Sequence, residues 1–129
     1  VLTGQVELAF VPLPAVLPYL PGGKVRIVAM ASSMRHPAVA GIATIAESGV
    51  AGFDASGWFG LFAPARTPSA VISLLNYDLN RALGEEFLQR ALTMQGMLPA
   101  PGTSEEFRAQ VEADRARWGA ILKTVAIKR

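Results

Sequence analysis

Three short apolar runs in the first half of the chain predict β-strands, over residues 5–10, 25–31 and 57–63. The run from Val25 to Ala31 is almost continuously apolar, as expected for a strand buried on both faces. The run around Trp58 is aromatic and free of charge, which also favours a buried strand. Between the first two runs, closely spaced prolines bound a short predicted helix over 13–20, and Gly22–Gly23 predicts a turn.

In the second half of the chain, the spacing of apolar residues changes to the 3.6-residue period of an α-helix. Apolar residues recur on one face of a predicted helix over 68–83, with Thr67 as its cap and Pro68 at its first position. A second helix is predicted over 85–95, ending at Gly96. A third is predicted over 103–126, where Thr103 and Glu106 have the spacing of a capping box. Its apolar stripe consists of Phe107, Val111, Trp118, Ile121, Leu122 and Val125.

Strands that alternate with helices indicate an α/β fold, and 129 residues suffice for one domain with a core of its own. A net charge of +2 without a basic cluster makes nucleic acid an unlikely class of partner. Residues 1–65 hold only six of the 22 charged side chains. The uncharged stretch 8–23 is too short and too rich in proline to span a membrane. It is either internal core or a surface that further sequence covers.

The side chains needed for catalysis are scarce. The chain has no cysteine and a single histidine, so neither a Cys–His pair nor a histidine-rich metal site can be built. His36 precedes Pro37 and is interpreted as a solvated loop residue. No serine lies in a G-x-S-x-G elbow, and no glycine run has the form of a phosphate loop. The sequence therefore predicts no catalytic residue, no metal site and no cofactor, which leaves binding as the function.

Several motifs in order resemble the receptors of tripartite tricarboxylate transporters, the Bug-type solute-binding proteins. The stretch from Gly4 to Phe10 is similar to a family strand, and residues 13–24 to the helix and turn that follow it. The residues that carry the central motif are Thr44, Glu47, Gly49, Trp58, Gly60, Ala63, Pro64, Thr67 and Pro68. One departure concerns binding, because Val11 stands where the family commonly has aspartate, directly after a strand.

The resemblance implies the C-terminal part of a two-lobed, type II periplasmic-binding-protein-like fold. Residues 1–33 would end one lobe, and residues 34–129 would form the crossover and the C-terminal part of the other. It implies a non-enzymatic, periplasmic receptor that captures a small carboxylated solute and delivers it to membrane permease subunits. The alternative is the effector-binding lobe of a transcriptional regulator, and an enzyme lobe is disfavoured.

Two groups of residues are candidates for ligand binding. Phe10, Val11, Leu13 and Ala15 follow the carboxyl end of a predicted strand, where open α/β sheets place ligands and helix-start N–H groups can hold a carboxylate. Trp58 and Phe59 could line the ligand site, although packing of the lobe is the favoured interpretation for both groups. The charge-poor first half also predicts self-association, as a homodimer with residues 1–31 near the contact.

Overall fold

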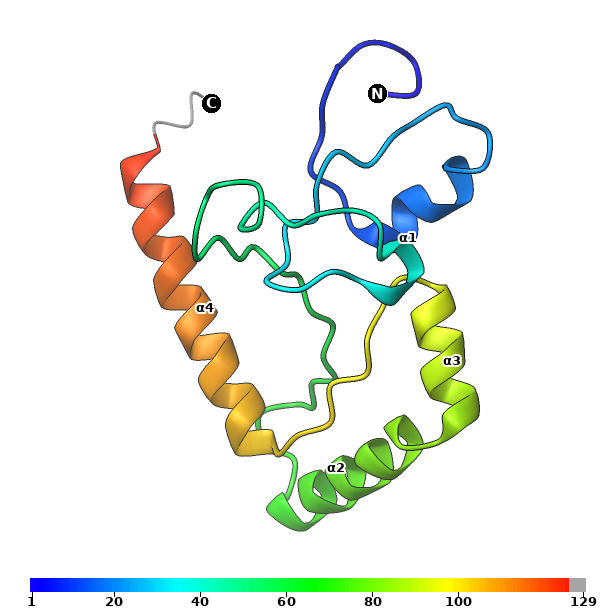
Figure 1. The fold of residues 1–129 in the computed structure, drawn as a ribbon. Coiled ribbons are helices and arrows are strands. Elements are labelled where there is room, and N and C mark those ends of the chain that lie inside the picture. Colours follow the sequence, from blue (N-terminus) through cyan, green and yellow to red (C-terminus); the bar gives the residue numbers. More distant parts are fainter. Residues whose placement is uncertain (126–129) are drawn as a thin grey trace. The chain divides into compact units, whose positions relative to one another are not determined.

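The computed structural model describes residues 1–125, and helices are the regular elements in it (Figure 1). They are α1 (Leu13–Val16), η1 (Leu17–Tyr19), η2 (Pro37–Val39), α2 (Ser69–Leu83), α3 (Glu86–Met94) and α4 (Ser104–Thr124). Contacts divide the chain into two compact units. Unit 1 comprises residues 1–62 and 85–99, and unit 2 comprises residues 63–84 and those from 100 onward. The boundary at residue 33 stays a prediction.

Local signals placed three helical regions correctly. The segment 13–20 is helical as α1 and η1, which adjoin each other. Helix α3 ends at Met94 with Gln95 as its C-cap, and Gly96 follows with a φ of +78°. A φ in the left-handed region suits glycine, which has no Cβ. At the start of α4, Thr103 and Glu106 form the predicted capping box in both directions. The predicted end of this helix, residue 126, lies outside the described residues.

The predicted start of α2 is wrong by one residue. Pro68, not Thr67, is the N-cap, and no side chain caps the helix. Pro68 has an extended ψ of 142°, so it lies outside the helix while its carbonyl accepts from the N–H groups of Val71 and Ile72. Proline has no backbone N–H, but no helical hydrogen bond is lost at this position, because the N–H groups at a helix start have no carbonyl acceptor within the helix.

An asparagine pair on α2 holds the chain that leads into α4. The Asn80 carboxamide accepts from the Gly102 N–H at 2.8 Å, and its Nδ2 donates to the Gly102 carbonyl at 2.9 Å. Asn76 Nδ2 donates to the same carbonyl, also at 2.9 Å. Residues four apart share one face of a helix, so both amides reach the same backbone group. Unit 2 is therefore fixed by polar contacts at Gly102, where α2 and α4 approach each other.

None of the three predicted strands forms a ladder within residues 1–125. One isolated parallel bridge joins Met30 to Thr44, with the Met30 N–H donating to Ala43 and the Ile45 N–H donating to Met30. The Ala55 N–H donates to the carbonyl of Ala31 on the other side of this segment. Apolar character favours a strand, but a strand also needs a neighbour along its length, and the described chain supplies neighbours only here.

The expected core is also absent from the described residues. The two buried residues are His36 and Thr44, and no apolar side chain is buried. On the apolar stripe of α4, Phe107 and Val111 are half-buried, whereas Trp118 and Leu122 are exposed. In the stretch 8–23, Leu8 and Phe10 are about 70% exposed, which favours its interpretation as a surface rather than as core.

No helix among the described residues is long and apolar enough to cross a membrane.

The capping box predicts a measurable loss when its hydroxyl is removed. We expect Thr103→Ala to lower helix stability by about 1 kcal/mol, because the Glu106 N–H loses its acceptor. Thr103→Ser keeps the hydroxyl and is the matched control. Amide hydrogen exchange in the first turn of α4 measures the difference. Equal exchange rates in the two variants would show that the hydroxyl does not stabilise the helix.

The turn after α3 gives a second prediction for stability. A Cβ on Gly96 would lie 2.9 Å from Leu13 Cγ and 3.0 Å from a methyl carbon of Leu17. Gly52 has a similar φ of +75° but open space around it. Both alanine variants cost about 1–2 kcal/mol of left-handed strain. Overpacking should add about 1–3 kcal/mol at Gly96 alone. Urea unfolding followed by circular dichroism compares them, and equal stabilities would exclude close packing at Gly96.

Candidate functional site

The best-connected part of unit 1 is a turn that begins at Thr44, whose side chain is 1% exposed. The Glu47 N–H donates to Thr44 Oγ1 at 3.1 Å, and the Thr44 N–H donates to Glu47 Oε2 at 2.7 Å. This is the reciprocal pattern of a capping box, here closing a turn that no helix continues. The Ser48 hydroxyl adds a bond to the Thr44 carbonyl at 2.8 Å. The Met30–Thr44 bridge attaches the turn to the segment before it.

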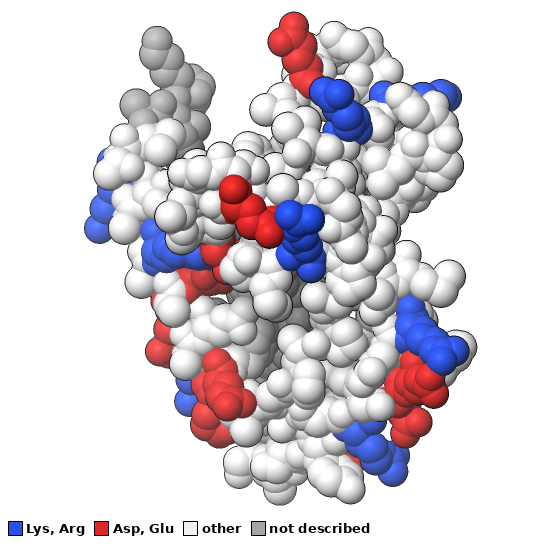
Figure 2. Space-filling view, in the orientation of Figure 1, with Lys and Arg blue, Asp and Glu red and all other residues white. Residues whose placement is uncertain are grey.

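Arg35 connects this turn to the preceding loop. Its Nε donates to both oxygens of Glu47, at 3.0 and 2.9 Å, and its Nη1 donates to the Ala40 carbonyl at 3.2 Å. Figure 2 shows one face of the molecule, on which acidic and basic side chains are interspersed rather than gathered by sign. From the sequence, Glu47 was predicted only to be part of the family motif. The signal for its structural role was the T-x-x-E spacing, which is the same as at Thr103.

These contacts favour the ionised form of Glu47. The hydrogen bond from Arg35, followed by that from the Thr44 backbone, holds the pKa of the Glu47 carboxyl below its usual value of 4.5. In unit 2, the Thr103 N–H and hydroxyl lower the pKa of Glu106 in the same way. The arrangement orders the backbone. The Glu47 carboxylate accepts three hydrogen bonds, two from Arg35 Nε and one from the Thr44 N–H, and these bonds hold the turn and the preceding loop together.

The interpretation of His36 as a solvated residue is wrong. His36 is 6% exposed and is the N-cap of η2, where its Nδ1 accepts from the Ala38 N–H at 3.1 Å. A ring nitrogen that accepts carries no proton in the neutral ring, so Nε2 carries it. Nε2 is buried without a partner among the described residues. The short helix η2 packs against α3, and His36 is buried at the start of η2 although it precedes a proline.

The six predicted binding residues all belong to unit 1, and five of them are exposed. Phe10, Val11 and Phe59 are 72%, 55% and 78% exposed. Ala15 is exposed too, and its N–H donates to the Pro12 carbonyl at 3.0 Å. Leu13 is half-buried at the start of α1. Trp58 is 36% exposed and lies against Phe62, with ring centroids 6.5 Å apart. Of the helix-start N–H groups of Leu13 and Ala15, that of Ala15 is therefore already bonded within the chain.

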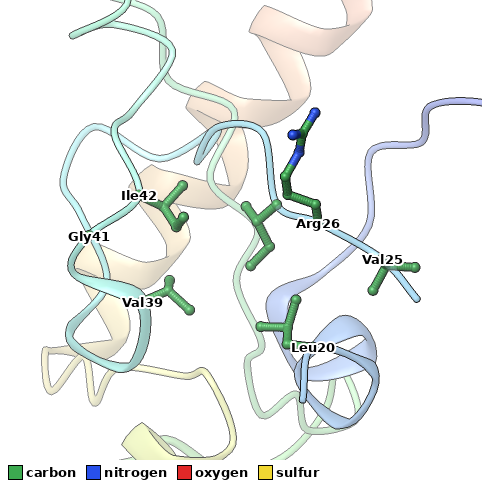
Figure 3. Close-up of a pocket in the computed structure, with 7 residues that line it drawn as sticks. Leu20, Val25, Arg26, Val39, Gly41 and Ile42 are labelled. Carbon is green, nitrogen blue, oxygen red and sulfur yellow. The ribbon is translucent and has the colours of Figure 1, made fainter. Parts of the chain in front are cut away.

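Unit 1 contains a pocket that the sequence did not suggest, with a volume of about 310 Å³. Figure 3 shows Val39 and Ile42 on one side and Leu20 on the other, with the guanidinium of Arg26 extending away from them. The remaining lining residues are Val25, Ile27 and Gly41. The lining is almost wholly apolar, and none of the six predicted residues contributes to it. Its residues come from separate segments, so no sequence spacing could have revealed it.

Comparison with known proteins decides the family. The family model of the tripartite tricarboxylate transporter family receptor matches residues 1–127. The chain belongs to this family. The resemblance inferred from the motifs is thereby confirmed, and it extends over nearly the whole chain.

Two relatives and one solved structure show the extent of the similarity. Protein BugT of Bordetella pertussis is 32% identical over 127 residues, which are 98% of this chain and 39% of BugT. The UPF0065 protein from the tcbD–tcbE intergenic region of a Pseudomonas species is 33% identical over 100 residues, 77% of this chain and 30% of that protein. A structure described as R. palustris Rpa4515 with adipate has a TM-score of 0.86 and 34% identity. It covers 95% of this chain and 41% of the other.

The chain therefore spans well under half the length of these receptors. The backbone agrees closely with the matching part of Rpa4515, at a TM-score of 0.86. This likeness supports the expected α/β fold class in part, because the described residues contain helices and one parallel bridge but no strand ladder.

The Glu47 network predicts a dependence on acid. Because the folded-state pKa of Glu47 lies below its usual 4.5, its contribution to stability is complete above that pH and is lost as the pH falls through the folded value. We expect wild-type unit 1 to lose stability in this range and Glu47→Gln to lose less. Urea unfolding monitored by Trp58 fluorescence, in a Trp118→Phe background, measures it.

Glu7→Gln is the control for this experiment, since Glu7 is an exposed carboxylate of the same unit. It should keep the wild-type acid dependence. An unchanged acid dependence in Glu47→Gln would mean that the Arg35 and Thr44 contacts do not stabilise the ionised carboxyl.

Proposed function

We propose that this chain forms part of a periplasmic, non-enzymatic receptor that binds a small carboxylate and passes it to membrane permease subunits. Family membership over residues 1–127 carries the proposal. The structural neighbour described with adipate, a six-carbon dicarboxylate, supports the ligand class. The alternative of a regulator's effector-binding lobe has no comparable support among these relatives.

For the binding residues, we retain Phe10, Val11, Leu13, Ala15, Trp58 and Phe59. The apolar members would cover the methylene chain of the ligand, and the Leu13 N–H would donate to a carboxylate oxygen. Helix α1 has only four residues, so its dipole contributes little and the single N–H is the main polar contact. Ala15 would contribute only van der Waals contact with the ligand, because its N–H already donates to the Pro12 carbonyl.

Binding by this chain alone should be weak. A ligand of this size gains affinity when a pocket encloses most of its surface, and the retained residues are open to solvent. We expect adipate to shift the amide resonances of residues 10–15 and the Trp58 indole resonance, with an affinity weaker than micromolar. 1,6-Hexanediol, which has the same chain length without carboxylates, should not shift them. Equal shifts with the diol, or submicromolar affinity for adipate, would overturn this interpretation.

A matched pair of variants tests the Leu13 N–H. Pro12 already has φ −60° and ψ 139°, which suit a residue that precedes proline, so Leu13→Pro is compatible with the backbone. It removes the N–H and the leucine side chain, whereas Leu13→Ala removes the side chain alone. We expect adipate-induced shifts to persist in the alanine variant and to disappear in the proline variant. Loss in both would assign Leu13 a packing role only.

A further inference from the structure

We propose that His36 is a pH-sensitive switch that controls whether η2 stays packed against α3. With a neutral ring, His36 caps η2 and the segment is closed. A proton added to the ring removes the cap and leaves a charge without a partner in a buried position, so the segment opens in mild acid. The inference concerns the loop of unit 1 that contains η2 and does not depend on the ligand.

The hydrogen bond of the ring determines which atom takes up the proton. Nδ1 of His36 accepts from the Ala38 N–H at 3.1 Å, so in the neutral ring the proton lies on Nε2. A second proton must therefore add to Nδ1, which becomes a donor and no longer accepts from Ala38. The cap and the charged form of the ring exclude each other.

Burial adds a second cost to the charged form. His36 is 6% exposed, and its Nε2 has no hydrogen-bond partner among the described residues. A buried charge loses its hydration, and this loss is large unless hydrogen bonds or an opposite charge compensate it. The closed segment therefore disfavours the charged ring, whereas water hydrates the ring when the segment is open.

The charged groups around the ring do not supply that compensation. Arg35, next to His36 in the chain, donates to Glu47, and this pair is close to neutral as a whole. Helix α3, against which η2 packs, and its N-cap carry three charged residues, all exposed: Glu85, Glu86 and Arg90. Glu86 and Arg90 pair with each other. No carboxylate among the described residues accepts from Nε2 of His36.

The segment that opens is connected to the rest of the loop. The Val39 N–H donates to the His36 carbonyl at 2.9 Å, and the Ala40 carbonyl accepts from Arg35 Nη1 at 3.2 Å. Val39 also lines the apolar pocket, together with Gly41. Release of η2 would therefore displace one side of the pocket as well as the cap.

The direction of the pH dependence follows from proton uptake. Opening takes up one proton, so it becomes more favourable as the pH falls. An imidazole in water gains its proton near a pH of about 6.5, so opening should become about tenfold more frequent between pH 7.5 and pH 5.5. Glu47 does not contribute over this interval, because the pKa of its carboxyl lies below its usual 4.5.

Hydrogen exchange at these two pH values tests the switch. Protection factors, which correct for the intrinsic pH dependence of exchange, are measured for the amides of Ala38 and Val39 in the full chain. We expect them to fall about tenfold at the lower pH in the wild type. In His36→Asn the side-chain oxygen can still cap η2 but takes up no proton, so the protection factors should stay constant. A fall in both proteins, or in neither, would overturn the proposal.

The ring itself gives a second readout that needs no substitution. Nitrogen-15 NMR at pH 7.5 should show a proton on Nε2 of His36 and none on Nδ1. The ring should gain its second proton over the interval in which Ala38 loses protection. Amides in the first turn of α4 are the internal control and should stay protected, since the pKa of Glu106 also lies below its usual 4.5. A proton on Nδ1 at pH 7.5, or a charged ring with Ala38 still protected, would refute the switch.

Discussion

An apolar side chain leaves water only when another surface covers it, and this constraint governs the whole structure. Half of the residues are apolar, yet the described chain buries none of them fully. Order in both units therefore comes mainly from hydrogen bonds at particular points. In unit 1 these are the bonds around Thr44, Glu47 and Arg35, and in unit 2 the asparagine contacts to Gly102. Such bonds contribute about 1 kcal/mol each, or up to about 3 with a charged partner, so they define local geometry better than they supply overall stability.

The same constraint separates what the sequence could predict from what it could not. A helix satisfies its own backbone, and its ends carry local signals. Thr103 with Glu106 and the glycine at 96 therefore located α4 and the end of α3 without any knowledge of tertiary contacts. A strand satisfies its backbone through a neighbour that is distant in sequence. The apolar runs at 5–10 and 57–63 have the composition of strands, but composition does not show whether the neighbour is present in the described chain.

The apolar pocket of unit 1 could not be predicted from the sequence, for a related reason. The pocket is assembled from Leu20, Val25, Val39 and Ile42, whose proximity depends on the bridge at Met30 rather than on any spacing along the chain. His36 was misjudged because its neighbour Pro37 suggested a loop, whereas burial by α3 is a tertiary effect. The family assignment succeeded because it required only the order of motifs. The order of motifs can be seen directly in the sequence, whereas tertiary contacts cannot.

The path of the backbone and the affinity for a ligand depend on different kinds of contact. A TM-score of 0.86 to the matching part of Rpa4515 means that the backbone path is kept over nearly all of this chain. The turns and caps that fix this path are local: the Thr44–Glu47 pair, the Thr103–Glu106 pair and the left-handed glycines. Affinity for a small ligand is different, because it depends on enclosure by surfaces on several sides. The backbone path around Phe10 and Phe59 therefore needs only local bonds, whereas tight binding there would need further surfaces to cover these exposed side chains.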